Sequence, residues 1–265
     1  MSISTQSAAL ILTIPFIGTT LGSACVFLMK GELSRRLEHF LLGFASGVMT
    51  AAAVWSLLLP SIDQSAAEGI GKLAAIPAAI GVAAGMLALL GLDNLIPHLH
   101  LNSESPEGVH SELSRKAMLC LAVTIHNIPE GMAPGILIAG LMTGSDGMTI
   151  GAALTLAIGL AIQNFPEGAV ISMPLAGGGT GKLRAFVLGT LSGAVEPLAG
   201  ILTVFFAESF VSMMPLFLSF AAGAMLYVVV EELIPEASGN DGSDFGTTGF
   251  GFGFILMMIL DKVFG

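Results

Sequence analysis

The chain has 265 residues, of which 54% are apolar and 11% are charged, compared with about 25% charged residues in an ordinary soluble domain. Its mean hydropathy is +0.88. This composition excludes a water-soluble globular protein and predicts a polytopic membrane protein. The formal net charge is −10, and the chain has only nine Lys and Arg residues. Because no basic surface is available to neutralise phosphates, nucleic acid is not an expected partner.

Eight segments are long and apolar enough to span a bilayer, which requires about 20 residues each. Clusters of Gly, Pro and charged residues separate them, and together they form one transmembrane domain over residues 1–265. In chain order the predicted spans are 8–29, 40–60, 76–96, 117–142, 148–173, 185–207, 213–234 and 245–264. The predicted fold is therefore all-α with eight transmembrane helices. The last span is the weakest helix former, because it contains four glycines.

The positions of the cations predict the orientation of the chain. Most of them fall in the odd-numbered connections between spans: Lys30, Arg35, Arg36, Arg115, Lys116, Lys182 and Arg184. Because cytoplasmic loops are enriched in Lys and Arg, these connections are expected in the cytoplasm. An even number of spans then places both termini on the extracytoplasmic side, and it makes the long connection at about 97–116 cytoplasmic.

Three acidic residues lie near the midpoints of predicted spans: Glu130, Glu167 and Glu196. A charged group near the centre of a bilayer costs at least roughly 2.5 to 3.5 kcal/mol on insertion scales. Because a partner must offset this cost, each of the three is a candidate site residue.

Two of these glutamates belong to a repeated element, HNIPEG at 126–131 and QNFPEG at 163–168. Residues four apart share one face of a helix. His126 is therefore expected above Glu130, and Gln163 above Glu167. Asn127 and Asn164, three residues before the glutamates, flank the same faces.

The prolines of the repeated element predict bends in the fourth and fifth helices. Pro129 and Pro166 lack an N–H, so the carbonyls of Ile125 and Ile162 lose their helical partners. Within a membrane, such carbonyls are tolerated where they face protein, water or a bound ion. Transporters place ion sites on interrupted helices of this kind, near mid-membrane.

The residue types favour a transition-metal cation. Glu196 adds a third carboxylate, and Met49 in the second span offers a thioether. Imidazole combined with carboxylate suits Zn²⁺, Fe²⁺, Mn²⁺ or Cd²⁺ better than Ca²⁺ or Mg²⁺. Because no set of thiolates is present to fix the metal, we expect a cation that is released, as a transported ion is, and no resident cofactor.

At these residues the chain resembles the ZIP (Zrt/Irt-like protein) family of divalent-metal transporters and is most similar to its bacterial GufA-like branch. HNxPEG is a hallmark of the family's fourth helix, and QNxPEG matches its fifth. The resemblance implies uptake of Zn²⁺ into the cytoplasm, with Fe²⁺, Mn²⁺, Co²⁺ or Cd²⁺ as further cargo. It also implies a homodimer in a bacterial inner membrane and an elevator-like movement of helices one, four, five and six.

The resemblance further implies a binuclear metal site. Around one metal it places His126, Glu130, Gln163, Glu167 and Met49. Around the second it places Asn127, Glu130, Asn164, Glu167 and Glu196. Family members with Asp at the position of Asn164 have one more anionic ligand there.

A second group of residues predicts a metal-handling route at the cytoplasmic exit. Its members are Asp93, His98, His100 and His110 around the long connection, with Glu231 and Glu232 at the inner end of the seventh span. Histidine and carboxylate together hold a borderline cation transiently. The alternative interpretation is a solvated loop with ordinary interfacial acids.

The predicted function is alternating-access import of a divalent cation. Two alternatives use the same residues: a transporter of protons or a non-metal solute, with the carboxylates as relays, and an intramembrane metallohydrolase. An enzyme is not expected, because the chain has no HExxH, no recognisable Ser/Lys pair and no nucleotide-binding motif.

Overall fold

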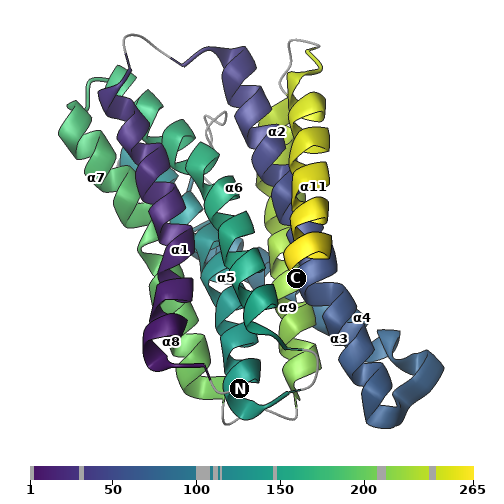
Figure 1. The fold of residues 1–265 in the computed structure, drawn as a ribbon. Helices are drawn as coiled ribbons and strands as arrows, with labels where there is room; N and C mark the ends of the chain where they lie inside the picture. The colour runs from purple at the N-terminus through teal and green to yellow at the C-terminus, as the bar shows by residue number, and fades with distance from the viewer. Residues whose placement is uncertain are drawn as a thin grey trace.

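The computed structural model describes residues 3–29, 33–99, 108–109, 113, 115–145, 148–207, 213–238 and 243–265. In these ranges the chain forms helices and no β-strand. Figure 1 shows most of the helices running side by side in one bundle. The predicted all-α polytopic membrane protein is confirmed.

The helices follow the predicted spans closely, with most boundaries displaced by a few residues. The first half contains α1 (Thr5–Ala24), α2 (Arg35–Ala52), α3 (Leu59–Ser65), α4 (Ala75–Leu95) and α5 (Arg115–Thr143). The second half contains α6 (Ile150–Gly177), α7 (Lys182–Gly193), α8 (Val195–Ala207), α9 (Met214–Val228), α10 (Ile234–Ser238) and α11 (Phe245–Phe264). The glycine-rich last span is helical.

Two of the long helical stretches contain a π-helical segment. Residues Ala53–Leu58 join α2 to α3, and residues Val229–Leu233 join α9 to α10. A π-turn widens the helix by one residue per turn and is common at functional sites. The second segment contains Glu231, which is exposed, and Glu232, which is buried.

Seven helical stretches within the described residues are long and apolar enough to cross a membrane. They are Thr5–Phe27, Arg35–Ser65, Gly71–Leu95, Ile150–Gly177, Lys182–Phe206, Met214–Ser238 and Phe245–Phe264. Helix α5 lies in the same bundle and has 29 residues. It carries the polar residues His126, Asn127 and Glu130, which lower its apolar content.

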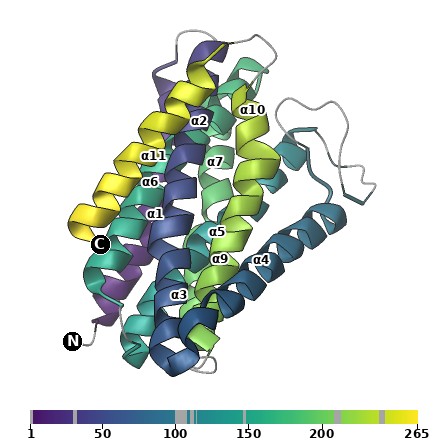
Figure 2. The same cartoon turned by 90° about the vertical axis from the view of Figure 1, so that its right-hand side faces the viewer.

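Close backbone packing joins particular pairs of helices. Helix α1 packs along α6, and α2 packs along α11. A Cβ added at Gly18 or Gly22 of α1 would clash with the backbone of α6, and one at Gly43 or Gly47 of α2 would clash with α11. Small residues four apart therefore let these helices approach closely. Helix α5 packs along α8, and α4 packs along α9. Figure 2 shows α4 at the edge of the bundle, running obliquely to the other helices.

Candidate metal centre

The two copies of the repeated element meet inside the bundle through Gln163. Its amide nitrogen donates to Glu130 Oε1 at 3.1 Å and to Glu167 Oε1. Glu130 and Gln163 are 0% exposed, and Glu167 is 9% exposed. Helices α5 and α6 continue as single helices through Pro129 and Pro166. The two glutamates of the repeated element are thus brought together across the α5–α6 interface.

Glu196 joins this pair from the first turn of α8. It is 1% exposed, and Thr19 Oγ1 of α1 donates to its Oε1 at 2.8 Å. All three carboxyl groups lie close enough to one another to interact electrostatically. Carboxylates gathered in a low-dielectric interior repel one another. The cluster is therefore stabilised by hydrogen-bond donors or by a cation.

The two asparagines tie the site to its neighbouring helices. Asn127 Nδ2 donates to the carbonyl oxygen of Ser192 at 3.2 Å, and Asn164 Nδ2 donates to that of Pro15 at 3.5 Å. These bonds use the nitrogen side of each amide. The Oδ1 atoms are buried, and within the described ranges they have no hydrogen-bond partner.

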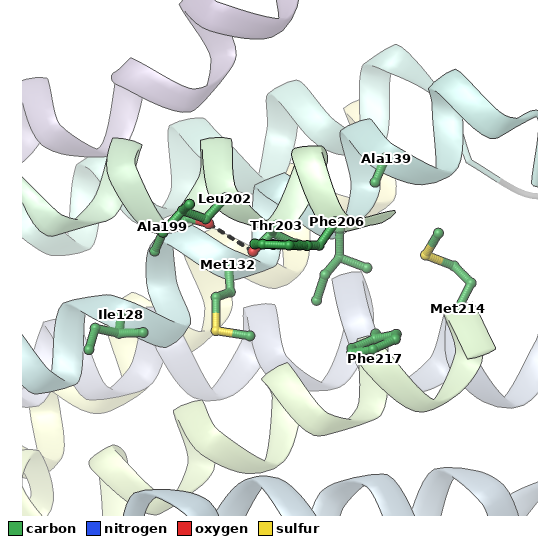
Figure 3. A pocket seen from close by; sticks show the side chains of 10 residues that line it. Ile128, Met132, Ala139, Ala199, Leu202, Thr203, Phe206, Met214 and Phe217 are labelled. Atoms are coloured by element: carbon green, nitrogen blue, oxygen red, sulfur yellow. Dashed lines mark hydrogen bonds between the residues drawn. The ribbon is translucent and has the colours of Figure 1, made fainter. Parts of the chain in front are cut away.

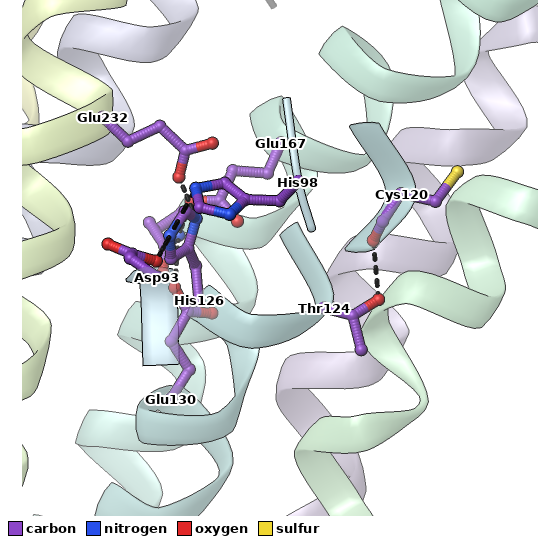
Figure 4. A network of polar contacts seen from close by, with 9 residues as sticks. Asp93, His98, Cys120, Thr124, His126, Glu130, Glu167 and Glu232 are labelled. Atoms are coloured by element: carbon purple, nitrogen blue, oxygen red, sulfur yellow. Dashed lines mark hydrogen bonds and ion pairs between the residues drawn. The ribbon is translucent and has the colours of Figure 1, made fainter. Parts of the chain in front are cut away.

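His126 points to residues of other helices (Figure 4). Its Nδ1 contacts Glu232 Oε2, and its Nε2 lies 3.8 Å from Asp93 Oδ1. His98 Nε2 lies at the same distance from Asp93 Oδ1, and His98 Nδ1 lies 2.9 Å from the carbonyl oxygen of Ile96. Glu167 also interacts electrostatically with both His126 and Glu232. The predicted mid-membrane set and part of the predicted exit route therefore form one continuous polar cluster.

Two further predicted site residues differ in burial. Met49 is fully buried in the hydrophobic core cluster, and Glu231 is exposed. His100 and His110 fall outside the residues that the structure describes. Glu232, which follows Glu231 in the chain, is in contrast buried and only 6% exposed.

The side chains of the cluster are paired with one another. Among the described residues, no three His, Cys, Asp or Glu side chains are arranged to hold a metal ion. Several buried oxygens nevertheless have no hydrogen-bond partner in this part of the chain: Glu130 Oε2, Gln163 Oε1, Glu196 Oε2, Asn127 Oδ1 and Asn164 Oδ1. A buried acceptor without a donor costs roughly 1–3 kcal/mol. Rotation of these side chains around a cation would satisfy such oxygens together.

An apolar cavity of about 290 Å³ lies between α5, α8 and α9 (Figure 3). Met132, Phe206 and Phe217 are among its lining residues. Among its described lining residues, Thr203 has a polar side chain, which donates to the carbonyl oxygen of Ala199 at 2.8 Å. The lining residues that the structure describes carry no ionisable side chain, in contrast to the polar cluster.

Sequence reasoning missed two supports of the site. Thr19 donates to Glu196, and the carbonyl oxygen of Ser192 accepts from Asn127. Neither residue belongs to a repeated or charged motif. For Thr19 the signal in the sequence is a hydroxyl residue within an apolar run, which is common in membrane helices. The backbone carbonyl of Ser192 gives no signal in the sequence.

Comparison with known proteins gives a consistent result. The family model described as "ZIP Zinc transporter" matches residues 98–261. The chain is 38% identical to the zinc transporter ZIPB of Bordetella bronchiseptica, over 94% of this chain and 79% of that protein. It is 35% identical to human zinc transporter ZIP11, over 93% and 94% of the two chains, and 33% identical to zinc transporter GufA of Myxococcus xanthus, over 94% and 96%.

Proposed function

This chain belongs to the ZIP family of zinc transporters, and we propose that it carries Zn²⁺ through the bundle by way of the polar cluster between α5, α6 and α8. The single observation that carries this proposal is the burial of three interacting glutamates at the interface of two repeated elements. Its apolar helices and bacterial relatives identify an integral protein of a bacterial inner membrane.

The proposed topology has eight spans with α5 as the fourth. Support comes from the length of α5 and from its position within the bundle. The N-terminus and the end of α11 both lie away from the end where α1 connects to α2 (Figure 1). Both termini then face the extracytoplasmic side, and import runs toward the end of the cluster formed by Asp93 and His98.

In the proposed bound state the glutamates replace the hydration shell of the cation. Glu130, Glu167 and Glu196 supply anionic oxygens, His126 supplies imidazole nitrogen, and Asn127, Gln163 and Asn164 supply neutral oxygens. This donor set suits Zn²⁺, and it also accommodates Fe²⁺, Mn²⁺, Co²⁺ and Cd²⁺. One or two ions fit the number of donors. Met49 of α2 would add a thioether sulfur.

Release is proposed to proceed through His126 to Asp93, His98 and Glu232. The support is the continuous chain of contacts between these groups. Alternating access would follow from movement of α1, α5, α6 and α7–α8 against the other helices. The close packing of α1 on α6 and of α5 on α8 favours their moving as one unit. The proposed assembly is a homodimer.

Zinc uptake into liposomes tests the proposed function. A zinc-sensitive dye inside vesicles reports flux through the purified protein, and Glu130→Ala and His126→Ala are expected to abolish it. Glu38→Gln is the matched control, because it removes a carboxylate from α2 outside the cluster. Unchanged zinc flux in Glu130→Ala would remove the cluster from the pathway. Proton flux without zinc binding would instead identify a proton transporter.

A further inference from the structure

The side-chain amide of Gln163 contacts both Glu130 and Glu167, the acid pair, and its nitrogen faces their carboxyl groups. Its side chain is 0% exposed, and the same Nε2 atom donates to Glu130 on α5 and to Glu167 on α6. A carboxamide NH₂ has two N–H donors, which is the number needed to serve two carboxylates. One amide group therefore bridges the two repeated elements.

The oxygen of the Gln163 amide does not bridge the two carboxyl groups. Gln163 Oε1 is buried, and in the described part of the chain it has no hydrogen-bond partner. Carboxylates accept hydrogen bonds, so the N–H side must face them and the oxygen must face away. A cation between the glutamates requires ligand atoms with a free lone pair, and the NH₂ group of an amide offers none. This amide orientation and a bound cation at the acid pair exclude each other.

We infer that Gln163 is a latch that closes the acid pair when no cation is bound. In the cation-free protein its NH₂ group holds Glu130 and Glu167 together and offsets their repulsion. When a cation arrives, the carboxamide makes a half-turn about its terminal bond and presents Oε1 to the ion. The terminal torsion of Gln is broad and roughly two-fold, so both orientations are rotamerically accessible. This inference rests on the proposed function.

The latch has a consequence for transport. Because the amide restores hydrogen bonds to both carboxylates as the ion departs, release does not leave the buried acid pair without partners. The latch therefore competes with the cation, weakening binding and speeding release. At the corresponding position of α5, His126 contacts Glu232 and lies near Asp93. The two copies of the repeated element thus have different roles. The copy on α6 closes the acid pair through Gln163, and the copy on α5 connects the pair to Asp93 and Glu232 through His126.

Isotope-edited infrared spectroscopy tests the rotation directly. The chain has three glutamines, Gln6, Gln64 and Gln163. In the double variant Gln6→Asn/Gln64→Asn, made by cell-free synthesis with glutamine ¹³C-labelled at the side-chain carbonyl, Gln163 is the only labelled side chain. Addition of ZnCl₂ is expected to move the ¹³C=O band to lower frequency, because the carbonyl gains a metal partner.

The outcomes separate the latch from the proposed function. If zinc saturates the protein and the carboxylate bands shift while the labelled band stays in place, the latch is wrong and zinc binding by the cluster stands. If zinc neither binds nor changes any band, the proposed function fails and the latch fails with it. A shifted ¹³C=O band together with shifted carboxylate bands supports both.

Gln163→Glu gives a second measurement, because it keeps an oxygen donor and removes both N–H donors. Without zinc the variant should melt at a lower temperature than the wild type, and with zinc the difference should disappear. For zinc uptake we expect KM to fall by about tenfold, the factor that corresponds to ~1.4 kcal/mol of lost competing hydrogen bonding, and Vmax to fall as well. Gln64→Glu adds the same charge on α3 and should leave both parameters unchanged. A zinc-free melting temperature equal to that of the wild type would overturn the latch.

Discussion

Gly131→Ala tests whether the close contact between α5 and α8 sets the geometry of the acid cluster. Gly131 follows Glu130 in α5 and lies against Glu196 at the start of α8. A Cβ at this position would lie 2.6 Å from Glu196 Cα and 2.7 Å from its carbonyl carbon, whereas ordinary contact begins at 3.4 Å. The carbonyl oxygen of Glu196 would lie closer still, so the contact distance must grow by at least about 0.8 Å, the difference between 2.6 and 3.4 Å. The obstructing atoms are backbone atoms that cannot rotate away.

The expected effect is a loss of both stability and zinc affinity. Overpacking of this kind costs typically about 1–3 kcal/mol. Metal–ligand distances must hold within about 0.2 Å, so a shift of this size between Glu130 and Glu196 disturbs any ion that they share. We expect KM for zinc to rise by about tenfold, which corresponds to ~1.4 kcal/mol of binding energy.

Uptake into liposomes and thermal unfolding of the purified protein measure the two effects. Gly91→Ala is the matched control, since a Cβ at this position of α4 would meet nothing within 4 Å. Alanine is also the better helix former, so the control should keep its KM and lose no stability. Wild-type KM and melting temperature in Gly131→Ala would refute the argument from helix contact.

Three further perturbations address other parts of the cluster. Thr19→Val removes the hydroxyl that donates to Glu196 at 2.8 Å. Because a buried acceptor left without a donor costs roughly 1–3 kcal/mol, thermal unfolding should show a destabilised protein. Thr19→Ser should remain close to the wild type. Acidification should reduce zinc uptake, because protons compete with the cation for imidazole and carboxylate ligands. The assay holds the pH equal on both sides of the vesicle membrane. Zinc uptake that rises as the pH falls would contradict the proposed ligands. Glu232→Gln weakens the contact with His126. For zinc uptake we expect Vmax to fall several-fold and KM to change by less than about twofold. An unchanged Vmax would remove Glu232 from the release route.

The sequence predicted the elements of this fold well, because length and hydropathy are strong signals in a membrane protein. The glycine-rich span 245–264 matches α11. The boundaries of the second and seventh spans were less accurate. Arg35–Ser65 and Met214–Ser238 extend beyond the predicted 40–60 and 213–234, because π-helical segments carry the helices onward.

The candidate site was only partly predictable. The i, i+4 spacing predicted that Gln163 shares a face with Glu167, and the two side chains are in contact. The same spacing could not predict that His126 contacts Glu232, since their contact depends on how α5 packs beside the π-helical segment. Sequence reasoning also treated Glu231 and Glu232 alike. The structure separates them, with one exposed and the other buried within the polar cluster.

The most direct test of the central claim is an anomalous-diffraction map of zinc-loaded crystals, recorded at the zinc absorption edge. The proposed function predicts a peak between α5 and α6, with Glu130 and Glu167 oxygens at about 2.0–2.2 Å from the ion. Zinc density restricted to the connection at 97–116, with the acid cluster still paired as described, would contradict it.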